Sequence, residues 1–322
     1  MSARPPPPSP PPASDRPPPP PGVEADYPLA RLSTVRTGGP ASHFARVHDP
    51  AQVAELLRWA RAARQPVSVV GSGSNLLIAD EGVAGLVIKL EGPLASIERE
   101  GLRLVCGGAA RLPAVAARAA QLGLAGIEFG VNIPGTVGGA VRMNANAYGG
   151  QLAQVLEWVE VATHAGLSRR APDELGFSYR SSNLGPGEVV VRASFALGER
   201  PSAEIKAVLA DMRARRRAAQ PSGIKTFGST FKNPDDEGGR TAGMLLEAAG
   251  LRGLRIGAAR FSPKHANFIE NTGSASTADI LALLHEGRRR VRERFGIELE
   301  PEVQLLGEVS FPWQESSNRP GP

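Results

Sequence analysis

The chain has 322 residues, one cysteine, 5% aromatic residues and a formal charge of +5. A single cysteine excludes an internal disulfide and any cysteine-rich metal site, and we expect no bound metal. No segment approaches the roughly 18–20 continuous apolar residues of a membrane span, and the N-terminus lacks the apolar core of a signal peptide. These features indicate a soluble cytoplasmic protein that does not contact a membrane.

The N-terminus is rich in proline, with 13 prolines in the first 28 residues. Such a run favours the extended polyproline II conformation and cannot bury a core, so residues 1–27 are predicted to form a disordered tail. A ligand for a proline-binding module is the alternative, but we favour a dispensable tail. Residues 311–322 are predicted to be a second, C-terminal tail.

Helix and strand signals follow the proline-rich run. Asp49 as a cap and Pro50 at the first helical position predict a helix with one apolar face. Strands are predicted at residues 67–70 and 85–90, with a turn at residues 81–82 between them.

The central part of the chain predicts a second group of elements. A hairpin about residues 100–101 is followed by a helix over residues 112–122 and by strands at residues 155–163 and 188–197. Cys106 stands at the end of an apolar strand, so we interpret it as a buried structural thiol rather than a reactive one.

In the last third, Ser202 is predicted to cap a helix that ends in the basic run RARRRAAQ, residues 213–220. Because no aromatic residue is interleaved with this run, we favour a solvated face that partly lines a phosphate-binding cleft over an RNA-binding face. Further helices are predicted at residues 241–249 and 277–295, and a strand at residues 297–307 closes the fold. Helices and strands mix without regular β-α-β alternation, which indicates the α+β class.

A glycine-rich loop follows the first predicted strand, in VSVVGSGSNLLIAD, residues 67–80. A Rossmann dinucleotide site needs a third glycine three residues after Gly73, where its helix packs, but Leu76 stands there. The residues that follow also lack the period of a helix. The loop therefore has the small residues and free backbone N–H groups that cradle a pyrophosphate, without the Rossmann helix.

A second glycine-rich stretch, GIEFGVNIPGTVGGAVRMNANAYGG, occupies residues 126–150. Pro134 and Gly135 predict a tight turn, and Gly138 and Gly139 allow close approach to the backbone. Either loop alone is also typical of plain turns. Two such loops in one half of a chain suggest one extended phosphate ligand that is held from two sides.

Together with their flanks, the two loops belong to an ordered set of six motifs. The motifs are RTGGPA (36–41), GSGSNLL (71–77), IPGTVGGAVRMNANAYGG (133–150), SYRSS (178–182), GSTFKNP (228–234) and LEPEV (299–303). This set resembles the UDP-N-acetylenolpyruvoylglucosamine reductase family over residues 36 to about 308. The short segment between Tyr179 and Val190 leaves no room for the tyrosine-bearing insertion of one family subtype, so the chain resembles the shorter subtype.

The resemblance implies an FAD-binding domain of the vanillyl-alcohol-oxidase type with two α+β lobes, residues 28–92 and 93–200. An α+β substrate-binding domain, residues 201–310, is implied to follow. FAD would bind noncovalently, and NADPH would reduce it before UDP-N-acetylglucosamine enolpyruvate is reduced to UDP-N-acetylmuramate, a peptidoglycan precursor. The residues implied to hold FAD are Gly71, Ser72, Gly73, Ser74, Asn75, Leu76, Pro134, Gly135, Thr136, Gly138 and Gly139.

Three residues match the catalytic positions of the family. Arg180 and Glu302 match the residues at the substrate carboxylate, where negative charge develops during reduction. A glutamate helps there only through its acid form, so its pKa should be raised. Ser229 matches the proton donor to the substrate carbon. Outside the resemblance, each would be interpreted as an ordinary turn, surface or strand-edge residue.

Tyr179, Lys232 and Asn233 are implied to contact the substrate, whereas His265 is interpreted as structural rather than catalytic.

The sequence leaves two rival functions open. One is another flavoprotein of the same fold, such as a sugar or hydroxy-acid oxidase, and the other is a non-enzymatic nucleotide- or nucleic-acid-binding protein. We expect a monomer with small-molecule ligands and no nucleic-acid partner.

Overall fold

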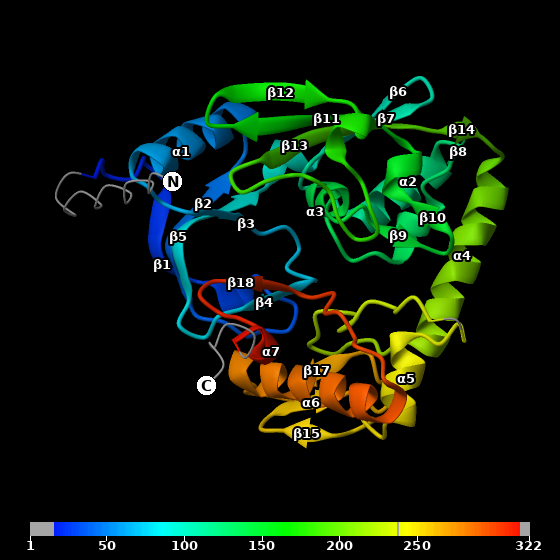
Figure 1. Ribbon diagram of the computed structural model, residues 1–322. Coiled ribbons are helices and arrows are strands. Elements are labelled where there is room, and N and C mark those ends of the chain that lie inside the picture. The colour runs from blue at the N-terminus through cyan, green and yellow to red at the C-terminus, as the bar shows by residue number, and fades with distance from the viewer. Residues whose placement is uncertain (1–15, 237, 316–322) are drawn as a thin grey trace, which may run out of the picture.

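The computed structural model describes residues 16–236 and 238–315 (Figure 1). Helices and strands are mixed in every part of the chain, which confirms the α+β class. None of the helices in these described ranges is both long and apolar enough to cross a membrane. The predicted tail residues 1–15 and 316–322 lie outside the described residues.

The first part is a four-stranded sheet in the order β1-β2-β5-β3, covered by α1. The Asp49 carboxylate accepts a hydrogen bond from the Ala51 amide at 2.6 Å, so the predicted cap of α1 is confirmed. The glycine loop after β3 leads into another strand, β4, and not into a helix, as the sequence predicts. The bounds are β1 Val23–Pro28, β2 Pro40–Val47, α1 Pro50–Ala62, β3 Val67–Val69, β4 Leu76–Ile78 and β5 Val83–Leu90.

The predicted end of the N-terminal tail is wrong. β1 begins at Val23, within the predicted tail, and pairs with β2 in antiparallel register from Val23 opposite Ala45 to Pro28 opposite Pro40. The Trp59 indole also donates a hydrogen bond to the Pro17 carbonyl at 3.1 Å. Composition missed this strand because its partner supplies the hydrogen bonds that the local sequence does not predict.

The second part is a five-stranded antiparallel sheet in the order β12-β11-β13-β7-β6, with α2 and α3 packed on it. β6 and β7 form the predicted hairpin, and Cys106 on β7 is fully buried, as expected. The bounds are β6 Ile97–Glu100, β7 Arg103–Gly107, α2 Leu112–Gln121, α3 Val137–Arg142, β11 Leu156–Thr163, β12 Gly166–Arg170 and β13 Val189–Ala196.

Four short strands and five 3-10 turns (η2 to η6) complete these two parts. β8 pairs with β14, and β9 pairs with β10. Their bounds are η2 Leu29–Arg31, η3 Gly92–Ala95, β8 Leu124–Ala125, η4 Glu128–Asn132, β9 Asn146–Ala147, β10 Gly150–Gln151, η5 Leu152–Gln154, η6 Pro172–Leu175 and β14 Gly198–Glu199.

A long helix, α4 (Ser202–Ala219), joins the upper and lower parts of the molecule in Figure 1. The predicted Ser202 cap is wrong, because Pro201 occupies the cap position and Ser202 is the first helical residue. The Ser202 hydroxyl donates instead to the Ala120 carbonyl at 2.6 Å. This hydrogen bond therefore links the start of α4 to α2.

The last part packs α5 and α6 with a three-stranded sheet, β15-β16-β17. α6 begins with a capping box of Ser276 and Asp279 and ends at Gly296, whose φ is +72°. This helix matches the predicted range. The bounds are α5 Ala242–Ala248, β15 Arg255–Ile256, β16 Ala259–Phe261, β17 Ile269–Asn271 and α6 Thr277–Phe295.

Two expectations about the C-terminus are wrong. Only β18 (Gln304–Leu306) forms within the strand predicted at residues 297–307, and it pairs in parallel with β4. The predicted tail begins within ordered structure, because Phe311 is buried and stacks on Trp313, a residue of α7 (Pro312–Glu315). The chain thus returns to its N-terminal part, which brings late residues beside the first glycine loop.

Candidate active site

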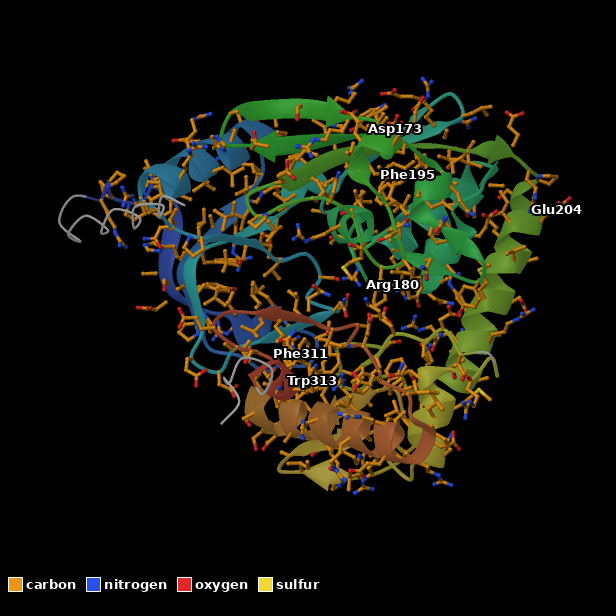
Figure 2. The ribbon with its side chains drawn as sticks, in the orientation of Figure 1. Asp173, Arg180, Phe195, Glu204, Phe311 and Trp313 are labelled. Atoms are coloured by element: carbon orange, nitrogen blue, oxygen red, sulfur yellow. The ribbon has the colours of Figure 1, made fainter. Side chains whose placement is uncertain are left out.

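A cleft of about 830 Å³ lies where the three parts of the fold meet. Both glycine-rich loops line it, and all eleven residues predicted to hold FAD are among its walls. Arg180, Ser229 and Glu302 line the same cleft. In Figure 2, Arg180 lies near the centre of the molecule, between the part that contains β11 and β13 and the part that contains α6.

The two glycine-rich loops are bonded to each other. The Ser72 hydroxyl donates to the Pro134 carbonyl at 2.5 Å. A side chain at Gly71 would place its Cβ only 2.5 Å from the Thr136 hydroxyl oxygen, so glycine is needed for this approach. The N–H groups of residues 72–74 donate to no other described residue, which leaves them free for a ligand.

The second loop leaves room where a ligand would lie. A Cβ added at Gly135 would meet only one atom within 4 Å, the Ile133 Cγ2 at 3.9 Å, and at Gly139 only the Thr136 hydroxyl oxygen at 3.6 Å. The backbone at these two glycines is therefore open to close approach. Free amides on one loop and open backbone on the other fit the pyrophosphate of FAD.

Arg180 and Glu302 form an ion pair in the cleft. Arg180 Nη2 lies 2.9 Å from Glu302 Oε1, and both side chains are largely buried. Arg180 has a φ of +57°, a left-handed backbone that costs a non-glycine residue about 1–3 kcal/mol. Its buried Nε has no hydrogen-bond partner among the described residues. A strained arginine with a spare donor is suited to receive an anionic ligand.

Burial raises the pKa of the Glu302 carboxyl, and the positive charges of Arg180 and Lys232 partly oppose this rise. The direction agrees with the expectation from the sequence. The carboxyl therefore keeps its proton to a higher pH than an exposed glutamate does. In that form it can donate a hydrogen bond to a carboxylate or to a developing negative charge.

Ser229 lies on a segment that is held from both sides. The next residue, Thr230, donates its N–H to the Asn267 carbonyl at 2.8 Å and accepts the Glu302 N–H at 2.9 Å. The Asn267 side chain bonds both the N–H and the carbonyl of Phe231, at 2.9 and 2.8 Å. These bonds place the Ser229 segment directly beside the segment before β18, which carries Glu302.

Of the three residues predicted to contact the substrate, two line the cleft and one does not. Tyr179 and Asn233 line the cleft, and the Asn233 side chain also accepts the Ala242 N–H at the start of α5. Lys232 is not among the described cleft residues, and its Nζ lies 3.1 Å from a Glu300 carboxylate oxygen. His265 accepts a hydrogen bond from the Asn267 amide, and burial lowers its pKa, both consistent with a structural residue.

The sequence did not single out two further residues of the site, Arg216 and Asn267. Arg216 lines the cleft, donates to the Asn132 carbonyl, and has a pKa lowered by burial. It belongs to the basic run that was predicted to line a cleft in part, but the sequence does not indicate which arginine of the run faces the cleft. Asn267 lies two residues after His265, and no local sequence pattern predicts the two hydrogen bonds of its side chain to the Phe231 backbone.

Comparison with known proteins agrees with this geometry. A family model described as an FAD-binding domain matches residues 41–171, which contain both glycine-rich loops. The fold and the cleft thus define an FAD-dependent oxidoreductase. A second model, the C-terminal domain of UDP-N-acetylenolpyruvoylglucosamine reductase, matches residues 220–306, which contain Ser229 and Glu302.

Full-length relatives carry the same name. The chain is 44% identical over 283 residues to UDP-N-acetylenolpyruvoylglucosamine reductase of Anaeromyxobacter sp. (strain Fw109-5), with 88% of each chain covered. It is 44% identical to reductase 2 of Symbiobacterium thermophilum, covering 89% of this chain and 92% of that one. The crystal structure of the Thermus caldophilus enzyme superposes with a TM-score of 0.76 at 40% identity, covering 88% and 98%. The chain belongs to the UDP-N-acetylenolpyruvoylglucosamine reductase family.

Proposed function

We propose that this chain reduces UDP-N-acetylglucosamine enolpyruvate to UDP-N-acetylmuramate with NADPH, as a cytoplasmic step of peptidoglycan precursor synthesis. The observation that carries the proposal is the Arg180–Glu302 pair, which faces the same cleft as the two loops suited to FAD. The names of the relatives and the motif set support the substrate. When bound, FAD supplies the hydride that NADPH delivers and that the substrate receives.

Arg180 and Glu302 bind the carboxylate of the enolpyruvyl group. Hydride addition to the methylene carbon moves negative charge onto the adjacent carbon and into this carboxylate. The Arg180 guanidinium stabilises that charge, and the protonated Glu302 carboxyl donates a hydrogen bond to it. Because both groups are largely buried and already in place, little reorganisation is needed during the reaction.

Ser229 donates the proton that completes the reduction. One hydride and one proton add across the carbon–carbon double bond, and the serine alkoxide then recovers a proton from solvent. A hydroxyl is a weak acid at neutral pH, so its value lies in position rather than acidity. The bonds of Asn267 to the adjacent residues, Thr230 and Phe231, supply this fixed position.

Anaerobic half-reactions test the proposal. The flavin of the purified protein should be bleached by NADPH and should regain its colour when the enolpyruvyl sugar nucleotide is added. Bleaching of the oxidised flavin by a simple sugar or hydroxy acid, with the colour restored by air, would instead support the rival oxidase function. A colourless protein that binds no FAD would reject the flavoenzyme altogether.

A further inference from the structure

Thr34 lies between the first glycine loop and the segment that leads to Ser229. It is half-buried in the connection between η2 and β2, outside the six motifs. Its hydrogen-bond partners are Gly73, 39 residues later, and Thr226, 192 residues later. One side chain therefore joins two segments that are distant in the sequence and that both line or adjoin the cleft.

Thr34 has two hydrogen-bond donors, its backbone N–H and its hydroxyl, and two carbonyl oxygens, those of Gly73 and Thr226, lie within reach of them. Its backbone N–H donates to the Gly73 carbonyl at 3.0 Å. Its hydroxyl oxygen lies 2.6 Å from the Thr226 carbonyl and 3.1 Å from the Gly73 carbonyl. A hydroxyl carries one proton, and Gly73 is already served by the backbone, so the hydroxyl proton goes to the nearer Thr226.

Thr226 in turn shapes the turn before Ser229. Its hydroxyl oxygen accepts the Gly228 N–H at 3.3 Å. Gly228 has a φ of +86°, a conformation that favours glycine, and Ser229 follows it directly. Thr34 and Thr226 therefore hold the chain before Ser229, while Asn267 holds it afterwards.

We infer that Thr34 is a positioning residue for Ser229. Its hydroxyl fixes the turn at residues 226–228 against the loop that faces FAD, and so sets where the serine hydroxyl points. The inference rests on the proposed function, because Ser229 is the proton donor only there. A displacement of about 1 Å in a reacting group can cost about 100-fold in rate, so one anchoring bond can matter.

Thr34→Val tests this, because it removes the hydroxyl and keeps the shape. Reoxidation by the enolpyruvyl substrate should slow about 10- to 100-fold. Flavin content, the thermal unfolding midpoint and flavin reduction by NADPH should stay near the parent values. Thr34→Ser should restore reoxidation to within about twofold. Thr37→Val is the matched control, because the buried Thr37 hydroxyl has no hydrogen-bond partner among the described residues.

A double variant separates positioning from a general structural role. In a Ser229→Ala background, Thr34→Val should change reoxidation by less than about twofold, because the group it orients is gone. If Thr34→Val slows reoxidation by the same factor in the Ser229→Ala background as in the parent, the inference is overturned. So would loss of flavin, or equal slowing of both half-reactions, in Thr34→Val alone.

Thr226→Ala provides an independent route if Thr34→Val does not fold. It removes the oxygen that accepts the Gly228 N–H and should slow reoxidation selectively; unchanged reoxidation would overturn the inference. If Ser229→Ala itself leaves reoxidation unchanged, the proposed function of Ser229 fails. If Ser229→Ala slows reoxidation and Thr34→Val does not, only the role of Thr34 fails.

Discussion

The Asn75 side-chain amide donates a hydrogen bond to the Glu302 carbonyl, 227 residues later, at 3.1 Å. The Asn75 carbonyl accepts the Gln304 N–H at 3.0 Å, and the parallel pairing of β4 with β18 continues from there. The loop expected to hold FAD is thus bonded to the segment just before β18, which carries the acidic residue of the site. The Asn75 side chain and the Asn75 backbone together hold the backbone of residues 302–304 beside the first glycine loop.

Replacing Asn75 should therefore weaken the whole junction. Asn75→Ala removes a partly buried hydrogen bond and should lower the free energy of unfolding by about 1 kcal/mol. Equilibrium unfolding in urea measures this change. Gln304→Ala is the matched control, because its exposed side chain reaches the same Glu302 carbonyl only at 3.4 Å. Equal losses in the two variants would contradict the role assigned to Asn75.

Cys106 should be inert in the folded protein. It is fully buried, and burial raises the pKa of its thiol to about 12, so almost no thiolate exists at pH 8. Ellman's reagent should detect no thiol in the native protein and one thiol per chain in guanidinium. Rapid reaction without denaturant would show that β7 opens readily.

FAD should be bound without a covalent bond. No histidine or cysteine is among the described residues that line the cleft. Cys106 is buried in a sheet, and the His43 ring packs edge-on against Trp59. Acid precipitation should therefore release all of the flavin into the supernatant. Yellow colour that stays in the washed pellet would contradict this expectation.

Local sequence predicts the elements whose stability is local. Asp49, Pro50 and Gly296 mark helix ends that the structure contains, because caps act within one turn of their own helix. β1 is not predicted at all, and the strand predicted at residues 297–307 forms only as β18, since each is a strand through its pairing with a distant partner. The proline-rich composition also concealed how early the ordered chain begins.

The same distinction applies to the site. Apart from Lys232, the residues that the motifs predicted for the site line the cleft, because glycine loops and the Arg180 segment are recognisable in short stretches of sequence. The motifs did not predict what holds these residues in place. Thr34 and Asn267 act through hydrogen bonds to segments 36 or more residues away, and such bonds leave no periodic or local pattern.

Ser229 and Arg180 should affect the two half-reactions differently. Ser229→Ala should leave flavin reduction by NADPH nearly unchanged and slow reoxidation by about 10²–10⁴-fold, the usual contribution of a positioned proton donor. Arg180→Ala should weaken substrate binding as well, because it removes charge from the carboxylate site. Stopped-flow absorbance measures each half-reaction.

Ser222→Ala is the control for the serine substitution, because Ser222 is exposed and lies on the same loop. It should leave both half-reactions unchanged. If Ser229→Ala slows both half-reactions equally, or neither, then Ser229 is structural and the proton comes from another group.

The pH dependence of reoxidation should report on Glu302. Its acid form is the one that assists, and burial raises its pKa, so the rate should be full at low pH. The rate should then fall as pH rises through that pKa, above the usual range of a glutamate. Lys232→Gln should move this fall to higher pH, because the Lys232 charge lowers the pKa of Glu302.

Glu302→Gln should abolish this fall, because the amide stays neutral and still donates a hydrogen bond. The remaining reoxidation rate should lie above that of Glu302→Ala, which loses a preorganised donor worth about 10²–10³-fold. Glu300→Gln is the matched control, since Glu300 is an exposed carboxylate two residues earlier that pairs with Lys232. If Glu302→Gln keeps the fall, or if the parent rate rises with pH, another group titrates and Glu302 acts as a carboxylate.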